Sequence, residues 1–176
     1  MLGLEAFSFV FRLIHILAGV AWVGGVFMFV VFVQPSAAAI GPAAGPMMGQ
    51  LLGARKLVDR LLLMAGITIG AGLILYVRLG ADAASFGDWA STGYGLALTI
   101  GMLAAIAAAS IGAFVTRPNV QALMALQRQV AESERSPTPE QGAEIAARQA
   151  KLKIMGRIAL SLLIVSVATM ATAQSW

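Results

Sequence analysis

Residues 6–33 read AFSFVFRLIHILAGVAWVGGVFMFVVFV, and this stretch decides the fold. Its only ionisable side chains are those of Arg12 and His15. A helix of about 20 apolar residues is long enough to cross the hydrocarbon core of a bilayer. The apolar residues are continuous, whereas a membrane-spanning strand would alternate apolar and polar side chains. The stretch therefore predicts a transmembrane helix that ends at Pro35.

The segment after this stretch, Ser36 to Ala39, consists of small residues and has the composition of a signal-peptide cleavage site. A signal peptide would also carry a basic region ahead of a shorter apolar run. No basic region precedes the apolar run here, and the run is about twice the length of a signal-peptide core. We therefore expect the first helix to be retained in the mature protein.

Three further apolar runs follow, at residues 57–79, 94–116 and 155–173. The composition agrees with a membrane protein, because hydrophobic residues make up 59% of the chain and charged residues only 11%. Soluble domains carry about 25% charged residues. The sequence predicts one integral membrane domain over residues 1–176, an all-α bundle of four transmembrane helices in a lipid bilayer.

The basic residues predict the orientation of these helices. Of the 12 Lys and Arg residues, all but Arg12 and Arg78 lie in or directly beside two connections, the one between the first and second spans and the one between the third and fourth. Both connections are on the same side of the membrane. The positive-inside rule places such connections in the cytoplasm. We therefore expect both termini outside, in a multi-pass protein of the cell inner (cytoplasmic) membrane. The ten residues are Arg55, Lys56, Arg60, Arg117, Arg128, Arg135, Arg148, Lys151, Lys153 and Arg157.

The cytoplasmic loop, residues 117–153, contains a helix start. Thr138 has the side chain of an N-cap, Pro139 suits the first helical position, and Gln141 completes a capping box. The last helix is therefore expected to begin in the cytoplasm and to enter the membrane without a break. Small residues also form rows on two spans, at Gly66 and Gly70 and along residues 101–112, which predicts close packing between helices.

Four residues of the first span carry the functional signal. At about 100° per residue, Arg12, His15, Gly19 and Trp22 fall within roughly one quadrant of the helix. Ionisable residues within a membrane usually point into the bundle, because exposure to lipid is costly. This arrangement suits haem b, with His15 as an axial ligand and Gly19 making room for the porphyrin. Arg12 would bind a propionate and Trp22 would close the inner edge.

The second axial ligand is left open by the sequence. Met102 on the third span lies at a similar depth to His15, and histidine–methionine ligation is therefore possible. Alternatively, His15 of two subunits could share one haem at the two-fold axis of a homodimer. Each residue also has a simpler interpretation: His15 could hydrogen-bond a backbone carbonyl or serve another metal or proton, Met102 could only pack, and Arg12 could reach the interface.

Several functional classes are excluded or unsupported. The chain has no cysteine, and this excludes disulfides, thiolate metal sites and iron–sulfur clusters within it. No basic stripe is interleaved with aromatic residues, so we expect no nucleic-acid partner. The sequence points to no catalytic residue, and whether the protein is an enzyme stays open.

The motif Arg-x-x-His-x-x-x-Gly-x-x-Trp-x-Gly-Gly, from Arg12 to Gly25, resembles that of the CopD-like copper-resistance membrane proteins. It is also similar to that of the HemJ-type protoporphyrinogen oxidases, and the four-span plan agrees with both. The resemblance implies copper handling in the first case and haem b bound through His15 in the second. HemJ-type proteins carry a basic residue in the third span, and its absence here between Tyr94 and Thr116 speaks against the oxidase activity.

The sequence also gives little support for copper transport. A copper path would need several His, Met or Cys ligands, and the chain has one His, no Cys and only scattered Met residues. The sequence therefore predicts a small membrane protein that binds haem b, with a role in electron transfer and a redox partner in or at the membrane. The alternatives are a copper-handling membrane protein and a structural subunit without a cofactor.

Overall fold

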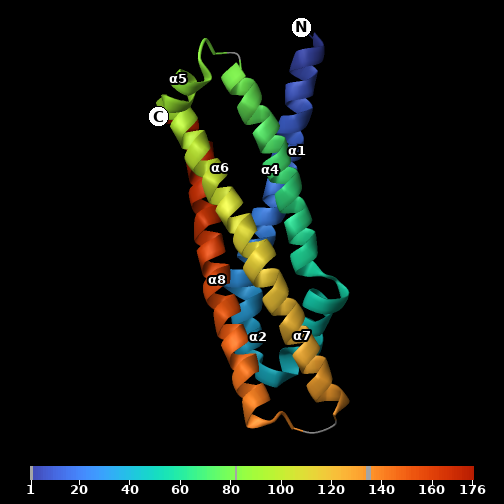
Figure 1. The fold of residues 1–176 in the computed structure, drawn as a ribbon. Helices are drawn as coiled ribbons and strands as arrows, with labels where there is room; N and C mark the ends of the chain where they lie inside the picture. Colours follow the sequence, from blue (N-terminus) through green and yellow to red (C-terminus); the bar gives the residue numbers. More distant parts are fainter. Residues whose placement is uncertain (1, 82, 134–135) are drawn as a thin grey trace.

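The computed structural model describes residues 2–81, 83–133 and 136–176, so that Arg135 of the charge count lies outside the described residues. Within these ranges the regular structure is entirely helical. Four helical segments are long and apolar enough to cross a membrane. They lie side by side, with both chain ends together at the end of the bundle that we call the terminal end (Figure 1). This confirms the predicted all-α class and the four-span bundle.

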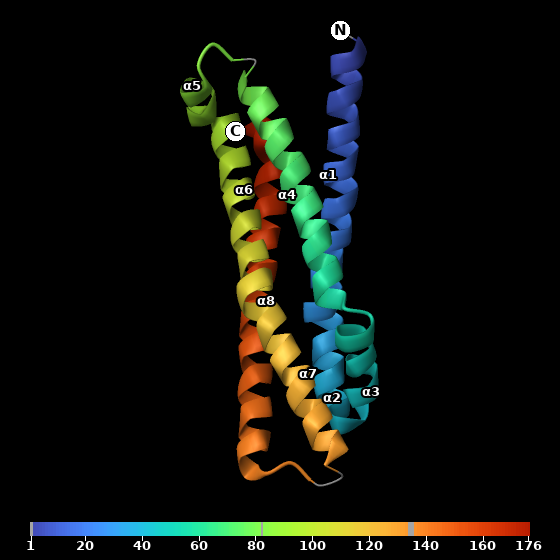
Figure 2. The same cartoon turned by 45° about the vertical axis from the view of Figure 1, so that its right-hand side comes forward.

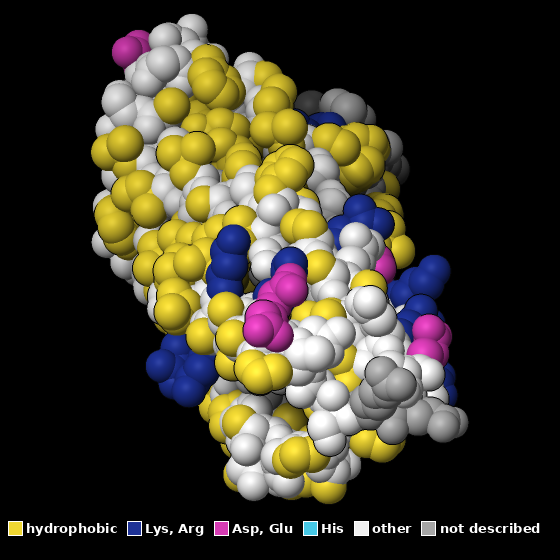
Figure 3. All heavy atoms as spheres, turned by 60° about the horizontal axis from the view of Figure 1, so that its bottom comes forward, with side chains coloured by type: hydrophobic (Ala, Val, Ile, Leu, Met, Phe, Trp, Pro, Cys, Tyr) yellow, Lys and Arg dark blue, Asp and Glu magenta, His cyan; other side chains and the backbone are white. Residues whose placement is uncertain are grey.

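The other end, which we call the basic end, carries the connections rich in Lys and Arg (Figure 3). In three of the four long helical segments the α-helix is interrupted or followed by a π-helical or 3-10 turn. The first segment comprises α1 (Leu2–Met28), the π-turn η1 (Phe29–Val33) and α2 (Gln34–Ile40), followed by η2 (Gly41–Ala44), α3 (Gly45–Met48) and η3 (Gly49–Ala54). The remaining elements are α4 (Leu57–Ala81), α5 (Phe86–Ser91), α6 (Gly93–Ile111), the π-turn η4 (Gly112–Thr116), α7 (Arg117–Glu132), α8 (Pro139–Thr172) and η5 (Ala173–Ser175).

The first helix does not end at Pro35, and that prediction is wrong. Proline cannot donate a backbone hydrogen bond, and in an α-helix its ring clashes with the carbonyl four residues back. In this chain the π-turn η1 precedes the proline, and the Gln34 N–H donates to the carbonyl of Phe29, five residues back. The wider turn accommodates the proline. The helix ends instead at Gly41, whose φ of 72° suits glycine.

The third span passes Pro118 in the same way. The π-turn η4 lies directly before it, and the Arg117 N–H donates to the carbonyl of Gly112, again five residues back. The helix therefore continues as α7, and most of the predicted loop of residues 117–153 is helical. An ion pair of 2.7 Å between Arg117 and Asp59 joins the starts of α7 and α4 at the basic end.

The long last helix is confirmed, together with its capping box. The Gln141 N–H donates to Thr138 Oγ1 at 3.2 Å, and the Thr138 N–H donates to Gln141 Oε1 at 3.0 Å. From Pro139 the helix α8 runs 34 residues from the basic end to the terminal end. Helix α7 packs against its first part, and the two form the extension of the bundle at the basic end together with α2 and α3 (Figure 2).

The bundle consists chiefly of two helix pairs, α1 with α4 and α6 with α8. Their shared core is a cluster of buried side chains: Trp22, Ala65, Ala105, Ala108 and Leu163. The small-residue row on α6 does bring helices together, because a Cβ at Gly101 would lie 2.8 Å from Thr169 on α8. The other row behaves differently. Gly66 and Gly70 on α4 are exposed and have no neighbouring atom within 4 Å of a Cβ position.

Candidate functional site

His15 on α1 makes a specific contact with α4. Its Nδ1 atom lies 2.8 Å from the carbonyl oxygen of Thr68. The imidazole ring lies against Gly72, where a Cβ would come within 2.7 Å of His15 Cε1. Glycine at position 72 therefore makes room for the ring. The Thr68 hydroxyl is held in turn, because it donates to the carbonyl of Met64 at 2.8 Å.

This contact fixes the chemistry that His15 can offer. A carbonyl oxygen only accepts, so in the neutral imidazole Nδ1 carries the proton and donates a hydrogen bond to the Thr68 carbonyl. The lone pair then lies on Nε2. Histidines that bind metals usually hold their second nitrogen in this way, with a carbonyl that fixes both the tautomer and the ring orientation. His15 is half-buried.

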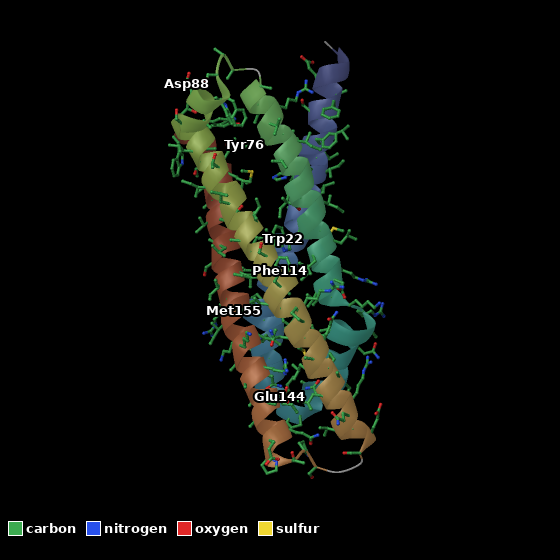
Figure 4. All side chains as sticks on the ribbon, in the orientation of Figure 1. Trp22, Tyr76, Asp88, Phe114, Glu144 and Met155 are labelled. Carbon is green, nitrogen blue, oxygen red and sulfur yellow. The ribbon has the colours of Figure 1, made fainter. Side chains whose placement is uncertain are left out.

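Gly19 and Trp22 lie toward the interior of the bundle, as helical periodicity predicted for their face of α1. A Cβ at Gly19 would lie 3.5 Å from the Thr68 methyl group, an ordinary contact, so that Gly19 belongs to the α1–α4 interface beside His15. Trp22 is only 4% exposed and forms part of the core cluster. Figure 4 shows it among the helices near the middle of the bundle.

Arg12 does not point into the bundle, and that prediction is wrong for the single chain. Its side chain is exposed. Arg12 lies about 60° from His15 and about 80° from Trp22 around the helix, at the edge of the shared quadrant. The buried face of α1 is centred on Ala18 and Trp22, and Arg12 lies about 120° and 80° from these two residues around the helix.

Met102 is half-buried on α6. Helix α6 packs chiefly on α8, whereas α1, which carries His15, packs chiefly on α4. The two candidate axial ligands therefore belong to different helix pairs. Among the described residues, no group of three or more His, Cys, Asp or Glu side chains could hold a metal ion. A metal at His15 would need ligands of another kind or from another molecule.

The structure also contains a cavity that the sequence did not predict. Its volume is about 470 Å³, and we call it the basal cavity because it lies in the half of the bundle near the basic end. Trp22 and Leu163 line it on the side of the core cluster, and Gln34, Gln149 and Lys153 line it toward the basic end. Segments from the whole chain form its walls, and no local motif could reveal it. The one local signal was the row of small residues at 146, 150, 156 and 159 on α8.

The fold and its apolar helices define the class of this chain, a multi-pass all-α membrane protein. No family model matches the sequence, and neither a curated protein nor a solved structure matches it. The resemblance to CopD-like and HemJ-type proteins therefore stays a prediction that rests on the motif of the first span.

Proposed function

We propose that this protein binds haem b through Nε2 of His15 and takes part in electron transfer within the membrane. The observation that carries the proposal is the hydrogen bond of 2.8 Å between His15 Nδ1 and the Thr68 carbonyl. It leaves Nε2 with a lone pair, as an axial ligand of haem iron requires. When bound, haem would supply an iron centre that accepts and releases one electron.

The residues around His15 fit such a group. The carbonyl of Thr68 orients the ring and makes Nε2 more basic, as second partners of metal-binding histidines do. Gly72 leaves the space that the ring occupies. Arg12 lies about one helical turn from His15 toward the terminal end, and its exposed guanidinium would donate hydrogen bonds to a propionate there. Trp22 lies about two turns from His15 in the other direction and lines the basal cavity, and it would close the site on that side.

Of the two candidates for the second axial ligand, Met102 of the same chain and His15 of a partner chain, we favour His15 of a partner chain. His15 is half-buried and Arg12 is exposed, so this side of α1 is accessible in a single chain. Met102 belongs to the other helix pair. A homodimer in which two His15 side chains share one haem would satisfy both observations, and it would bury the site against a second copy.

The test is the absorption spectrum of protein purified in detergent after expression with ample haem. We expect a Soret band, reducible α and β bands, and one haem per two chains. His15→Ala should abolish the low-spin spectrum, and Arg12→Leu should weaken haem retention. Met102→Leu should leave the spectrum unchanged if His15 of a partner ligates, and should alter it if methionine does. A colourless native protein, or an unchanged spectrum in His15→Ala, would overturn the proposal.

The same hydrogen bond supports a second candidate, a structural subunit in which His15 only joins α1 to α4. Hydrogen bonds between transmembrane helices contribute about 0.6 kcal/mol on average. This candidate predicts a colourless protein whose unfolding in mixed micelles is easier in His15→Ala. A colourless protein that retains copper through purification would instead favour the copper-handling alternative.

A further inference from the structure

We propose that the basal cavity binds a fatty acid, with the acyl chain directed toward Trp22 and the carboxylate at Lys153. This inference goes beyond haem binding and does not depend on it, because His15 does not line the cavity. The cavity volume of about 470 Å³ lies within the range of about 300–1,000 Å³ that is usual for small-molecule sites.

The cavity is long enough for an acyl chain. From Lys153 to Leu163, both of which line it, α8 rises about 15 Å at about 1.5 Å per residue. From Trp22 to Gln34 on the opposite wall the rise is about 18 Å by the same measure. An extended chain advances about 1.2 Å per bond. The cavity therefore accommodates roughly 12 to 15 bonds of an extended chain, which matches common fatty acids.

The polarity of the lining fits a chain with one charged end. Leu163 and Trp22 are almost fully buried at the inner end of the cavity. Toward the basic end the lining becomes polar, with Gln149 and Lys153 one helical turn apart on the same face of α8. Lys153 is the only ionisable side chain among the described residues that line the cavity. An amphipathic ligand would therefore place its head group at Lys153.

The charge at this position suits a head group with a single negative charge, such as a carboxylate. One lysine balances the single charge of a carboxylate, whereas a phosphate monoester carries close to two charges. A phospholipid phosphodiester also carries one charge, and the test below separates it from the acid by its head group. Two arginines near the basic end are already engaged by carboxylates, and neither lines the cavity. Arg148 is ion-paired with Glu144 at 2.7 Å, and Arg117 with Asp59 at 2.7 Å.

Three π-helical segments contribute to the cavity wall: η1, η4 and also η3, through Leu52. Phe29 and Val30 of η1 line it on one side, and Gly112 and Thr116 of η4 line it on another. A π-turn widens a helix locally and occurs often at functional sites. Here η1 and η4 lie in helices that face each other across the same space. This coincidence is expected if the space is kept open for a ligand.

The test uses the fluorescence of Trp22. The double variant Trp89→Phe, Trp176→Phe leaves Trp22 as the only tryptophan, because the chain has three. Palmitic acid brominated near its methyl end should quench Trp22, because the chain end reaches it. The same acid brominated beside the carboxylate should quench it much less. Equal quenching by both isomers would contradict the proposed orientation.

Specificity for the head group is tested in the same double variant. Lys153→Gln should weaken binding of the acid by up to about fivefold, because an ion pair with an exposed lysine contributes up to about 1 kcal/mol. Lys151→Gln is the matched control and should change nothing, because Lys151 is exposed on the same helix, as Lys153 is, but does not line the cavity. Each methylene removed from the acid should weaken binding by about fourfold, from about 0.8 kcal/mol per methylene.

Two results would overturn the proposal. If the methyl ester or a brominated phospholipid quenched Trp22 as strongly as the acid, the cavity would be filled by bulk lipid without selection. If Lys153→Gln and Lys151→Gln behaved alike, the carboxylate would not lie at Lys153. Neither result bears on haem binding, because quenching is measured on haem-free protein and haem binding is read from the absorption spectrum of separate, haem-loaded samples.

Discussion

The imidazole of His15 and the main chain of Thr68 are joined by a hydrogen bond of 2.8 Å, although 53 residues separate them in sequence. Both residues lie in segments that are apolar enough to span a membrane. A polar group in that environment needs a partner, because no water is available to satisfy it. The bond therefore sets the relative position of α1 and α4 and at the same time determines which nitrogen of His15 carries a lone pair.

Gly72→Ala should disturb this arrangement. The new methyl group would lie 2.7 Å from His15 Cε1, so the ring must move and the bond to Thr68 must lengthen. Overpacking of this kind typically costs about 1–3 kcal/mol. The measurement is the unfolding free energy in mixed detergent micelles, together with haem content if the protein is loaded.

The control for that variant is Gly70→Ala on the same helix. No atom lies within 4 Å of its Cβ position, so the substitution should be neutral or slightly stabilising because alanine favours a helix. Equal losses in the two variants would mean that the His15 ring does not depend on the space at Gly72.

The orientation of the bundle is tested by single cysteines at Ser85 and Ser136, since the chain has no cysteine of its own. Both residues are exposed, Ser85 in the connection before α5 and Ser136 in the connection before α8. The positive-inside rule predicts that an impermeant thiol reagent labels intact cells at position 85 and not at position 136. The reverse pattern would place both termini in the cytoplasm.

The first turn of α8 should loosen in acid. The pKa of the Glu140 carboxyl is lowered below its ordinary value of 4.5 by a hydrogen bond from the backbone amide of Glu140 and, to a smaller extent, by one from the Thr138 side chain. Because the folded-state pKa is the lower one, the contribution to stability is complete above about pH 4.5 and is lost as the pH falls through the folded value. A spin label at Ala143 should become more mobile over that interval.

Glu140→Gln is the control for the acid response. The label in this variant should show no step in mobility at low pH, because residue 140 no longer titrates. Thr138→Ala should raise mobility at every pH, since an N-cap contributes about 1 kcal/mol. If the step persisted in Glu140→Gln, another group would be responsible for it.

The sequence predicted the number of spans and the start of the last helix because these depend on local properties. Apolar length defines a span, and Thr138 with Gln141 defines a cap. The end of the first span at Pro35 and that of the third span at residue 116, before Pro118, were predicted wrongly for a physical reason. A proline stops an α-helix through its clash with the fourth carbonyl back, and that argument fails when a π-turn changes the hydrogen-bond register. The residue types at 29–33 and 112–116 give no signal from which a π-turn could be predicted.

The site was predictable in part. The residues on the inner face of α1 follow from helical periodicity, and Trp22 is buried as that face requires. The partner of His15 was not predictable, because a backbone carbonyl has no sequence signature and Gly72 resembles the exposed Gly70 in the same helix. The prediction that Arg12 points into the bundle failed, because a quadrant of the helix surface is wider than the interface that α1 makes with its neighbours.

The π-turn η1 has a consequence for sequence variation in this chain. It inserts one extra residue into the helix, so that the side chains of α2 are rotated by about 100° relative to a continuous α-helix. Deleting one residue from 29–33 would restore regular pitch and would set Pro35 against the carbonyl four residues before it. The deletion should therefore be tolerated only when Pro35 is replaced as well. A one-residue gap at η1 and the loss of the proline are coupled changes, and related sequences should carry both or neither.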